Sequence, residues 1–428
     1  MKNLVTFVLS LLITTTPYTQ SLPTFSDQVF RQEIKISVPL PLSMNGEIIR
    51  VIPYRGDIVM VCTGGIFRYS KSTWTEVAKG QWQHAFTDAE QQIWLISQDS
   101  ILAFAKDTGV PLPMEARDHR VISGFYERST DKFYIGTEKG LYSFDGQWQL
   151  HDQIRDFTVN DIKSGFGDDL WVATMDGLWR RNNHNWVNLD NVLMAEANDR
   201  QYFSLMNIDS GAYLAYSAPL SVGGIARDGN HWVWSGNSGL PYGPVTLIRA
   251  RENTFWLGTS MGAIRRDDKS WHYYLGKRWL EEPEVVDILP LEDRTWLATP
   301  NSISEIKEIN INLRDKAEFY DSLIQIRHNR LGLINRSRLT IPGDISTSHA
   351  INQDNDGLWT ATYLVAQCFR YAATKSEESR ELAIRTYEAL ERLETVTGIS
   401  GYPARSFARA EDVVEQSRSP HPKKWHRS

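Results

Sequence analysis

The strongest constraint on the fold is a short phrase that recurs seven times between residues 60 and 299. In its clearest copies a tryptophan precedes a threonine by three residues and a glycine by six, as in Trp171-x-x-Thr174-x-x-Gly177. The seven copies are anchored at Met60, Trp94, Tyr134, Trp171, Tyr213, Trp256 and Trp296. Their spacing of about 34 to 43 residues is typical of four-stranded propeller blades. We expect seven blades.

Most copies close with a tryptophan eight or nine residues beyond the glycine, such as Trp148 and Trp271. The turn before it is often Asp-Gly, as at Asp145-Gly146, which is a strong signal for a β-hairpin. Each repeat therefore predicts a small antiparallel sheet. Since one such sheet cannot bury both of its faces, the sheets must stack around an axis. Thirteen of the fifteen tryptophans lie in this region, where we expect them to pack between blades.

The phrase Trp-x-x-Thr-x-x-Gly-Leu, with a later Asp-Gly-x-Trp, resembles the two-component-regulator propeller repeat. The resemblance covers roughly residues 45 to 310. That family is best known from extracellular sensor domains of bacterial hybrid kinases, so the resemblance implies a ligand-binding sensor propeller and an association with glycans. Nothing in this sequence resembles a kinase or receiver domain.

The amino terminus predicts export. Lys2 precedes an apolar run from residue 4 to residue 13, and small polar residues follow up to Ser21. This pattern predicts a signal peptide at residues 1–21 and a secreted or periplasmic protein. The run is too short to span a bilayer, which needs about 20 apolar residues, and no later segment qualifies.

The charge of the chain limits the class of binding partner, and its two cysteines limit the possible thiol chemistry. The chain has 46 basic and 52 acidic residues, a net charge of −6, without a basic block. This disfavours nucleic acid, whose phosphates need concentrated Lys and Arg. Carbohydrates, small molecules and proteins remain as partners. The only two cysteines, Cys62 and Cys368, fall in different predicted domains, and we expect free, buried thiols.

The seventh repeat lacks a tryptophan-bearing last strand. Residues 29–38, near the amino terminus, alternate apolar and polar side chains, as a half-buried strand does. We expect this segment to supply the missing strand and to close the ring, since closure removes an exposed sheet edge.

After residue 312 the pattern becomes helical. Apolar residues recur at helical spacing in three stretches, near residues 319–326, 358–369 and 382–396. The expected organisation is thus multi-domain: a signal peptide at 1–21, an all-β seven-bladed propeller at 22–312 and an all-α domain at 313–428. The helical segment resembles part of the α/α toroid of carbohydrate-active enzymes such as polysaccharide lyases and glycoside hydrolases. Its length predicts either an incomplete toroid that continues past residue 428 or a short helical appendage.

Candidate chemistry lies in this helical segment. Asp354 and Asp356 could serve as general acid and base, as a calcium-binding corner, as a clamp for sugar hydroxyls, or as an ordinary helix cap and turn. Trp359 and Tyr363, four apart on one helical face, could stack on a sugar ring or be core aromatics, and Arg405 could hold a carboxylate or be an ordinary surface residue. As proton carriers we consider the lone histidines His349, His421 and His426.

Two functions of different classes follow. The first is a glycan-processing protein, in which the propeller supports a helical lyase or hydrolase domain. The second is a non-enzymatic recognition protein, in which the propeller binds a ligand at its axis or loops. A lengthened link at residues 216–224 would suit a contact loop in the second. No nucleophile elbow, zinc motif or phosphate loop is present.

Overall fold

The computed structural model describes residues 26–106, 108–166, 169–182, 185–190, 200–208, 213–240, 244–267, 270–341, 344–409 and 415–416. The predicted signal peptide, His421 and His426 lie outside these residues. The chain divides into two compact units. One comprises Glu33–Ile309, and the other combines the segment before Glu33 with the residues from Asn310 onward. Among the described residues, no helix is long and apolar enough to cross a membrane.

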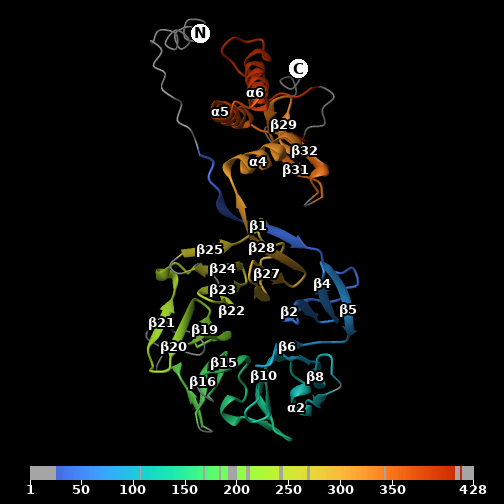
Figure 1. Cartoon of the computed structure of the whole chain (residues 1–428), viewed down its shortest axis with the longest axis vertical. Coiled ribbons are helices and arrows are strands. Elements are labelled where there is room, and N and C mark those ends of the chain that lie inside the picture. The colour runs from blue at the N-terminus through green and yellow to red at the C-terminus, as the bar shows by residue number, and fades with distance from the viewer. Residues whose placement is uncertain are drawn as a thin grey trace. The chain divides into compact units, whose positions relative to one another are not determined.

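The first unit is a seven-bladed β-propeller, as predicted (Figure 1). In six blades four consecutive strands pair as neighbours, and they pair antiparallel. The first three of these blades are β2 (Ile48–Tyr54), β3 (Asp57–Cys62), β4 (Gly65–Ser70) and β5 (Thr73–Lys79); β6 (His84–Thr87), β7 (Ile93–Ile96), β8 (Ser100–Ala103) and β9 (Gly109–Pro111); and β10 (Val121–Glu127), β11 (Lys132–Thr137), β12 (Gly140–Phe144) and β13 (Trp148–Leu150). The next three are β14 (Val159–Ser164), β15 (Leu170–Thr174), β16 (Gly177–Asn182) and β17 (Asn185–Asn188); β18 (Ser204–Ile208), β19 (Tyr213–Ala218), β20 (Ser221–Ala226) and β21 (His231–Trp234); and β22 (Val245–Arg251), β23 (Thr254–Thr259), β24 (Gly262–Asp267) and β25 (Ser270–Tyr274). Short helical turns interrupt the loops at α2 (Met114–Arg117), η1 (Asp152–Ile154) and η3 (Gly236–Ser238).

The recurring phrase encodes the turn between the second and third strands of a blade. The Thr174 hydroxyl donates to the Gly177 carbonyl at 2.8 Å and accepts from the Asp176 N–H at 3.1 Å. Thr259 donates to the Gly262 carbonyl in the same way, also at 2.8 Å. Gly177 and Gly262 have φ angles of 124° and 141°, which side chains rarely allow. The threonine and the glycine therefore act together as one turn signature.

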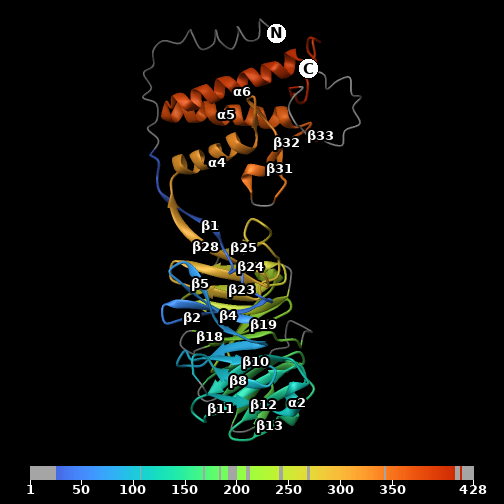
Figure 2. The same cartoon turned by 90° about the vertical axis from the view of Figure 1, so that its right-hand side faces the viewer.

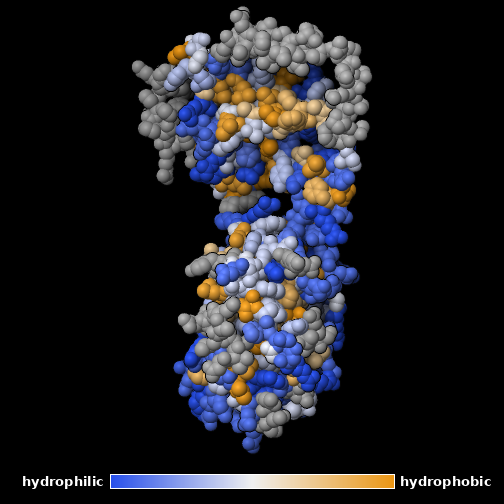
Figure 3. All heavy atoms as spheres, turned by 90° about the vertical axis from the view of Figure 1, so that its left-hand side faces the viewer, coloured by the Kyte–Doolittle hydropathy of each residue, from blue (hydrophilic) through white to orange (hydrophobic). Residues whose placement is uncertain are grey.

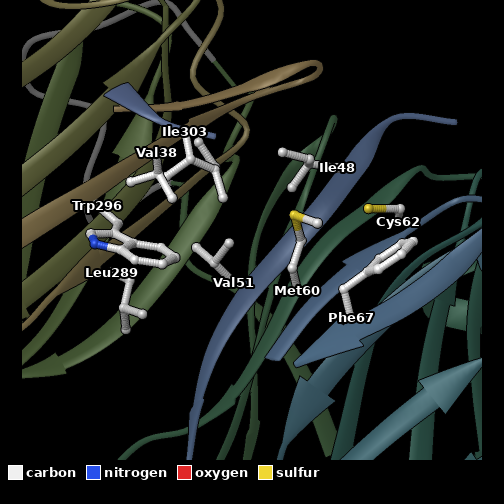
Figure 4. Packing of buried hydrophobic residues seen from close by; sticks show 10 residues of the cluster. Val38, Ile48, Val51, Met60, Cys62, Phe67, Leu289, Trp296 and Ile303 are labelled. Carbon is white, nitrogen blue, oxygen red and sulfur yellow. The ribbon is translucent and has the colours of Figure 1, made fainter. Parts of the chain in front are cut away.

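The tryptophan of the phrase packs between blades. Trp171, Trp256 and Trp296 are at most 3% exposed. Figure 4 shows Trp296 in the core between the last and first blades, with Val38 and Leu289 close by and Val51 and Met60 facing it. Complete burial of a large apolar side chain stabilises the fold by about 1.5–3 kcal/mol. The repeat thus combines a turn and an inter-blade anchor.

The seventh blade confirms the predicted closure. Its order is β1-β28-β27-β26, so β1 (Phe30–Val38) completes the sheet formed by β26 (Asp287–Pro290), β27 (Arg294–Thr299) and β28 (Ser302–Ile311). Glu33 of β1 also binds the preceding blade. Its carboxylate accepts from the Tyr274 hydroxyl at 2.7 and 2.8 Å and forms an ion pair with Arg265.

The lengthened link expected in the fifth blade is wrong. Ala218 pairs with Ser221, and Ser217 pairs with Val222, so β19 and β20 are joined by a two-residue turn at Pro219 and Leu220. The prediction placed the end of the link at Gly224, but Gly223 and Gly224 lie inside strand β20. No contact loop exists there.

The second unit contains the three predicted helices together with strands that the periodicity did not predict. The helices are α4 (Leu313–Arg327), α5 (Asp356–Thr374) and α6 (Glu377–Thr395), and Figures 1 and 2 show α5 and α6 side by side. Between α4 and α5 lie β29 (Asn329–Arg330), β30 (Leu333–Ile334), β31 (Arg336–Leu339), η4 (Ile345–Thr347) and β32 (Ser348–Asn352), and β33 (Glu415–Gln416) pairs with β32. These strands are too short for a readable alternation.

Both cysteines are free, as expected. Cys62 is buried on β3, and burial raises the pKa of its thiol to about 12. Cys368, on α5, is exposed rather than buried. It lies on the outer side of α5, beside the buried position Gln367.

Candidate functional site

The two aspartates at the start of α5 have opposite surroundings. Asp356 is fully buried, and its Oδ2 accepts from the Ser406 hydroxyl at 2.6 Å and from the Gln353 N–H at 3.2 Å. Burial raises the pKa of its carboxyl, against these hydrogen bonds, which lower it. Asp354 is exposed, and its backbone carbonyl accepts from Arg405 at 3.4 Å.

This geometry supports the ordinary turn among the alternatives open for Asp354 and Asp356, although the N-cap residue of α5, Asn355, makes no side-chain capping hydrogen bond. One carboxylate ties the loop to the start of the helix, and the other faces solvent, so they do not share an opening. Within the described ranges no group of three or more His, Cys, Asp or Glu side chains could hold a metal ion. The Arg405 guanidinium is exposed and contacts a backbone carbonyl.

Tyr363 belongs to a hydrogen-bond network between α4 and α5. It is 6% exposed; its hydroxyl donates to Asp321 and accepts from Gln325 at 2.7 Å. Asp321 also accepts from Gln367 at 3.0 Å and from Arg370 at 2.8 Å. Burial is the largest of the effects that raise the pKa of Tyr363. Its ring is therefore closed to a sugar, and of the two alternatives open for Tyr363 the structure supports the core aromatic.

The remaining predicted residues are not gathered into one constellation by any described contact. Trp359 is half-buried in the first turn of α5. His349 is half-buried on β32, where it pairs in register with Arg338 of β31.

A second set of polar residues lies on the first strands of the propeller blades. First strands of neighbouring blades contact one another, so they surround the axis. We call the following residues the axial cluster: Arg50 on β2, His84 on β6, Asp161 and Lys163 on β14, Arg249 on β22 and Asp287 on β26. Sequence reasoning missed this cluster. A partial signal existed, because all seven repeats carry a polar residue nine to eleven positions before the anchor, although Lys163 and Arg249 lie eight and seven positions before theirs.

Asp287 joins three blades within the axial cluster. Its side chain is 1% exposed. Oδ1 accepts from the Arg249 guanidinium at 2.7 Å, and Oδ2 accepts from the Val51 N–H at 3.0 Å. Arg50 Nε lies 3.3 Å from the same Oδ2. The first strand β2 has a bulge between Ile48 and Arg50, and the carboxylate binds the backbone just beyond it.

Asp161 likewise joins two blades, since it lies on β14 and binds the backbone of β18 in the following blade. Its Oδ2 accepts from the Leu205 N–H at 2.9 Å, and its Oδ1 accepts from the Ile162 N–H at 2.9 Å. Lys163 Nζ lies 3.4 Å from Oδ1. Ser204 extends the chain of contacts, since its hydroxyl accepts from the Ile248 N–H at 3.2 Å. The inner side chains thus bind each blade to the next.

The axial cluster has an excess of positive charge. Among the described residues, the carboxylates in contact with Arg50, Lys163 and Arg249 are those of Asp161 and Asp287. Burial lowers the pKa of Lys163, and Arg50 and Arg249 lower it further, partly offset by Asp161. Burial likewise lowers the pKa of His84, and every charged group that shifts it is a cation. His84 is therefore neutral at pH 7 in a positive field.

No family model and no curated protein matches this chain. Solved structures are similar in fold. An extracellular domain assigned to the hybrid two-component system BT3049 of B. thetaiotaomicron has a TM-score of 0.51 and 15% identity, over 73% of this chain and 45% of that chain. One assigned to the one-component system BT4673 of the same organism has a TM-score of 0.50 and 14% identity, over 66% and 42%. Inactive virginiamycin B lyase from Staphylococcus aureus, with quinupristin, has a TM-score of 0.53 and 11% identity, over 65% and 99%.

At these identities the likeness establishes the propeller fold. This chain spans less than half the length of the two B. thetaiotaomicron domains. The resemblance read from the repeats and the structural likeness therefore agree on a β-propeller fold.

Proposed function

We propose that this protein is an exported recognition protein whose propeller binds a ligand at the axial cluster. The observation that carries the proposal is the convergence of six titratable side chains, from five different blades, around the axis. Buried charges stabilise a fold less well than apolar packing does, so such a gathering indicates a functional site. The residues also join the blades, which positions them rigidly for a ligand.

Carbohydrate is the ligand class we propose. The repeats resemble those of sensors associated with glycans, and the solved structures with this fold include extracellular domains of bacterial sensory systems. The signal peptide at residues 1–21 is part of the proposal, because it brings the propeller to the compartment where glycans are met. A role as a scaffold for the C-terminal unit is compatible with binding.

Glycan cleavage by the C-terminal unit has weaker support. A lyase or hydrolase needs an acid, a base and an open cleft around the substrate. The Asp356 carboxylate accepts a hydrogen bond from Ser406, and the Tyr363 hydroxyl donates one to Asp321. Asp354 is exposed at the surface. No described contact joins them into a catalytic arrangement.

The test is a glycan-array screen of the purified chain, compared with its Trp359→Ala and Arg405→Ala variants. We expect the wild type to bind a subset of glycans and both variants to bind the same subset with unchanged strength. Loss of binding in either variant would move the site to the start of α5. Absence of binding to any glycan by a folded wild type would refute carbohydrate as the ligand class.

A further inference from the structure

We propose that the axial cluster binds an anionic group, so that the ligand is an acidic one carrying a carboxylate, such as a uronate sugar. The proposal rests on the proposed function for the location of the site, and it adds the chemical class.

The carboxylates of the axial cluster are already occupied. Both oxygens of Asp287 accept hydrogen bonds, one from Arg249 and one from the Val51 backbone. Both oxygens of Asp161 accept backbone hydrogen bonds, from Ile162 and Leu205. Backbone N–H groups thus occupy much of the hydrogen-bond acceptor capacity of Asp161 and Asp287. The three cations, Arg50, Lys163 and Arg249, have only the rest of that capacity as their carboxylate partners. One positive charge is left in excess.

Lys163 is the cation most available to a ligand. Its ammonium group has three N–H donors, and its ion-pair partner among the described residues is Asp161, at 3.4 Å. Its side chain remains 34% exposed although protein groups surround it closely enough to lower its pKa. This combination describes a side chain that lines an opening rather than one that packs in a core.

Arginine supplies further donors nearby. Arg50 Nε has no hydrogen-bond acceptor among the described residues, although Asp287 lies 3.3 Å away. The Arg50 side chain is 25% exposed, and that of Arg249 is 18% exposed. Arg50 and Arg249 contact the same carboxylate, Asp287, and the charges of both also lower the pKa of Lys163.

A carboxylate fits this arrangement for two reasons. It would offset the excess charge and relieve the repulsion among the cations, and its two oxygens would accept charge-assisted hydrogen bonds from lysine and arginine. A neutral sugar offers hydroxyl groups but no compensating charge. The axial cluster should therefore discriminate between glucuronate and glucose, which differ at one carbon.

The experiment compares Lys163→Gln with Lys132→Gln by calorimetric titration with glucuronate, glucose and acetate at constant ionic strength. Lys132 is a matched control, because it lies on a blade strand, is 34% exposed and pairs with one carboxylate, Asp145. Lys163→Arg retains the charge. We expect the affinity for glucuronate and acetate to fall about tenfold or more in Lys163→Gln, and to persist in the other two variants.

The outcomes separate this proposal from the proposed function. Binding of glucose and glucuronate with equal affinity, unaffected in Lys163→Gln, would overturn the anion site and leave the recognition function intact. Binding of acetate that depends on Lys163, without any glycan bound on the array, would support the anion site and refute the carbohydrate ligand. If Lys163→Gln fails to fold, failure of acetate to raise the melting temperature of the wild type above that in chloride would overturn the proposal.

Discussion

His151 shows how a polar side chain is satisfied inside the propeller. Its Nδ1 accepts from the Trp186 indole at 3.2 Å, so Nε2 carries the proton and donates to the Ser143 hydroxyl at 3.0 Å. The ring is stacked on Tyr134 at 6.3 Å between centroids. Burial first, and then the charge of Arg181, lower the pKa of His151 to about 4. The neutral ring is therefore part of the folded structure.

We predict that His151 makes the propeller sensitive to acid. Its pKa is about 4 in the folded state and about 6.5 in an unfolded chain, so the unfolded chain binds the proton first. The neutral His151 ring therefore stabilises the folded propeller fully above about pH 6.5, and this stabilisation is lost as the pH falls towards 4. His151→Gln should show a smaller fall in the free energy of unfolding between pH 7 and pH 4.5, measured by urea denaturation with tryptophan fluorescence.

The control for this prediction is His231→Gln, since His231 is exposed at the start of β21. That variant should retain the acid sensitivity of the wild type. If the free energy of unfolding falls equally with pH in the wild type and in His151→Gln, then His151 does not contribute to the acid sensitivity.

Strand β1 decides whether the ring is closed. It supplies the last strand of a blade whose other strands come from the far end of the propeller sequence. Glu33 adds polar contacts to Arg265 and Tyr274 of the preceding blade, and its side chain is 19% exposed. Lys35, two residues on, contacts Glu281, whose side chain is 53% exposed. The more buried pair, Glu33 and Arg265, should therefore contribute more to the stability of the propeller than the exposed pair, Lys35 and Glu281.

We predict that Glu33→Ala lowers the free energy of unfolding of the propeller by about 2 kcal/mol, because it removes the charge-assisted hydrogen bonds to Arg265 and Tyr274, while Asp267 remains as a carboxylate partner of Arg265. Glu281→Ala should change it by less than about 0.5 kcal/mol, since exposed ion pairs contribute little. Urea denaturation followed by tryptophan fluorescence reports on the propeller, which holds thirteen of the fifteen tryptophans. Equal effects of the two substitutions would contradict this assignment of Glu33.

The C-terminal unit exposes many large apolar side chains. Figure 3 shows apolar residues gathered on the face of this unit that it presents. The most exposed on its helices are Leu313, Phe319, Ile326, Leu358, Val365, Phe369 and Tyr387, each more than half exposed. Soluble proteins rarely leave large contiguous apolar patches open, and such patches indicate association. The stripes predicted at helical spacing are thus only partly buried.

We predict that this surface causes the protein to self-associate as its concentration rises. The double variant Leu358→Ser and Phe369→Ser should reduce association in sedimentation velocity and change the unfolding free energy by less than about 1 kcal/mol, because these residues are 65% and 72% exposed. Leu393→Ser, at a site 5% exposed, should destabilise the unit by about 2 kcal/mol or more. Unchanged association in the double variant would refute the role of this surface.

Local patterns were sufficient for the repeats, for the closing strand at residues 29–38 and for three helices. Turn chemistry at Thr174 and Gly177, and the alternation in β1, act between residues close in the chain, so a sequence displays them. The turn at Pro219 and Leu220 was misplaced because glycines inside β20 imitate a turn signal.

The sequence by itself determined the seven blades, their anchors and the change to helices, because strand and helix periods are short-range properties of the chain. Tertiary structure alone decided which polar groups meet. Asp354 and Asp356 are two residues apart, yet one is exposed and the other buried. Arg50 and Asp287 are far apart in the chain and meet because the ring closes. Burial and charge proximity depend on the packing of the whole ring, and no local pattern contains them.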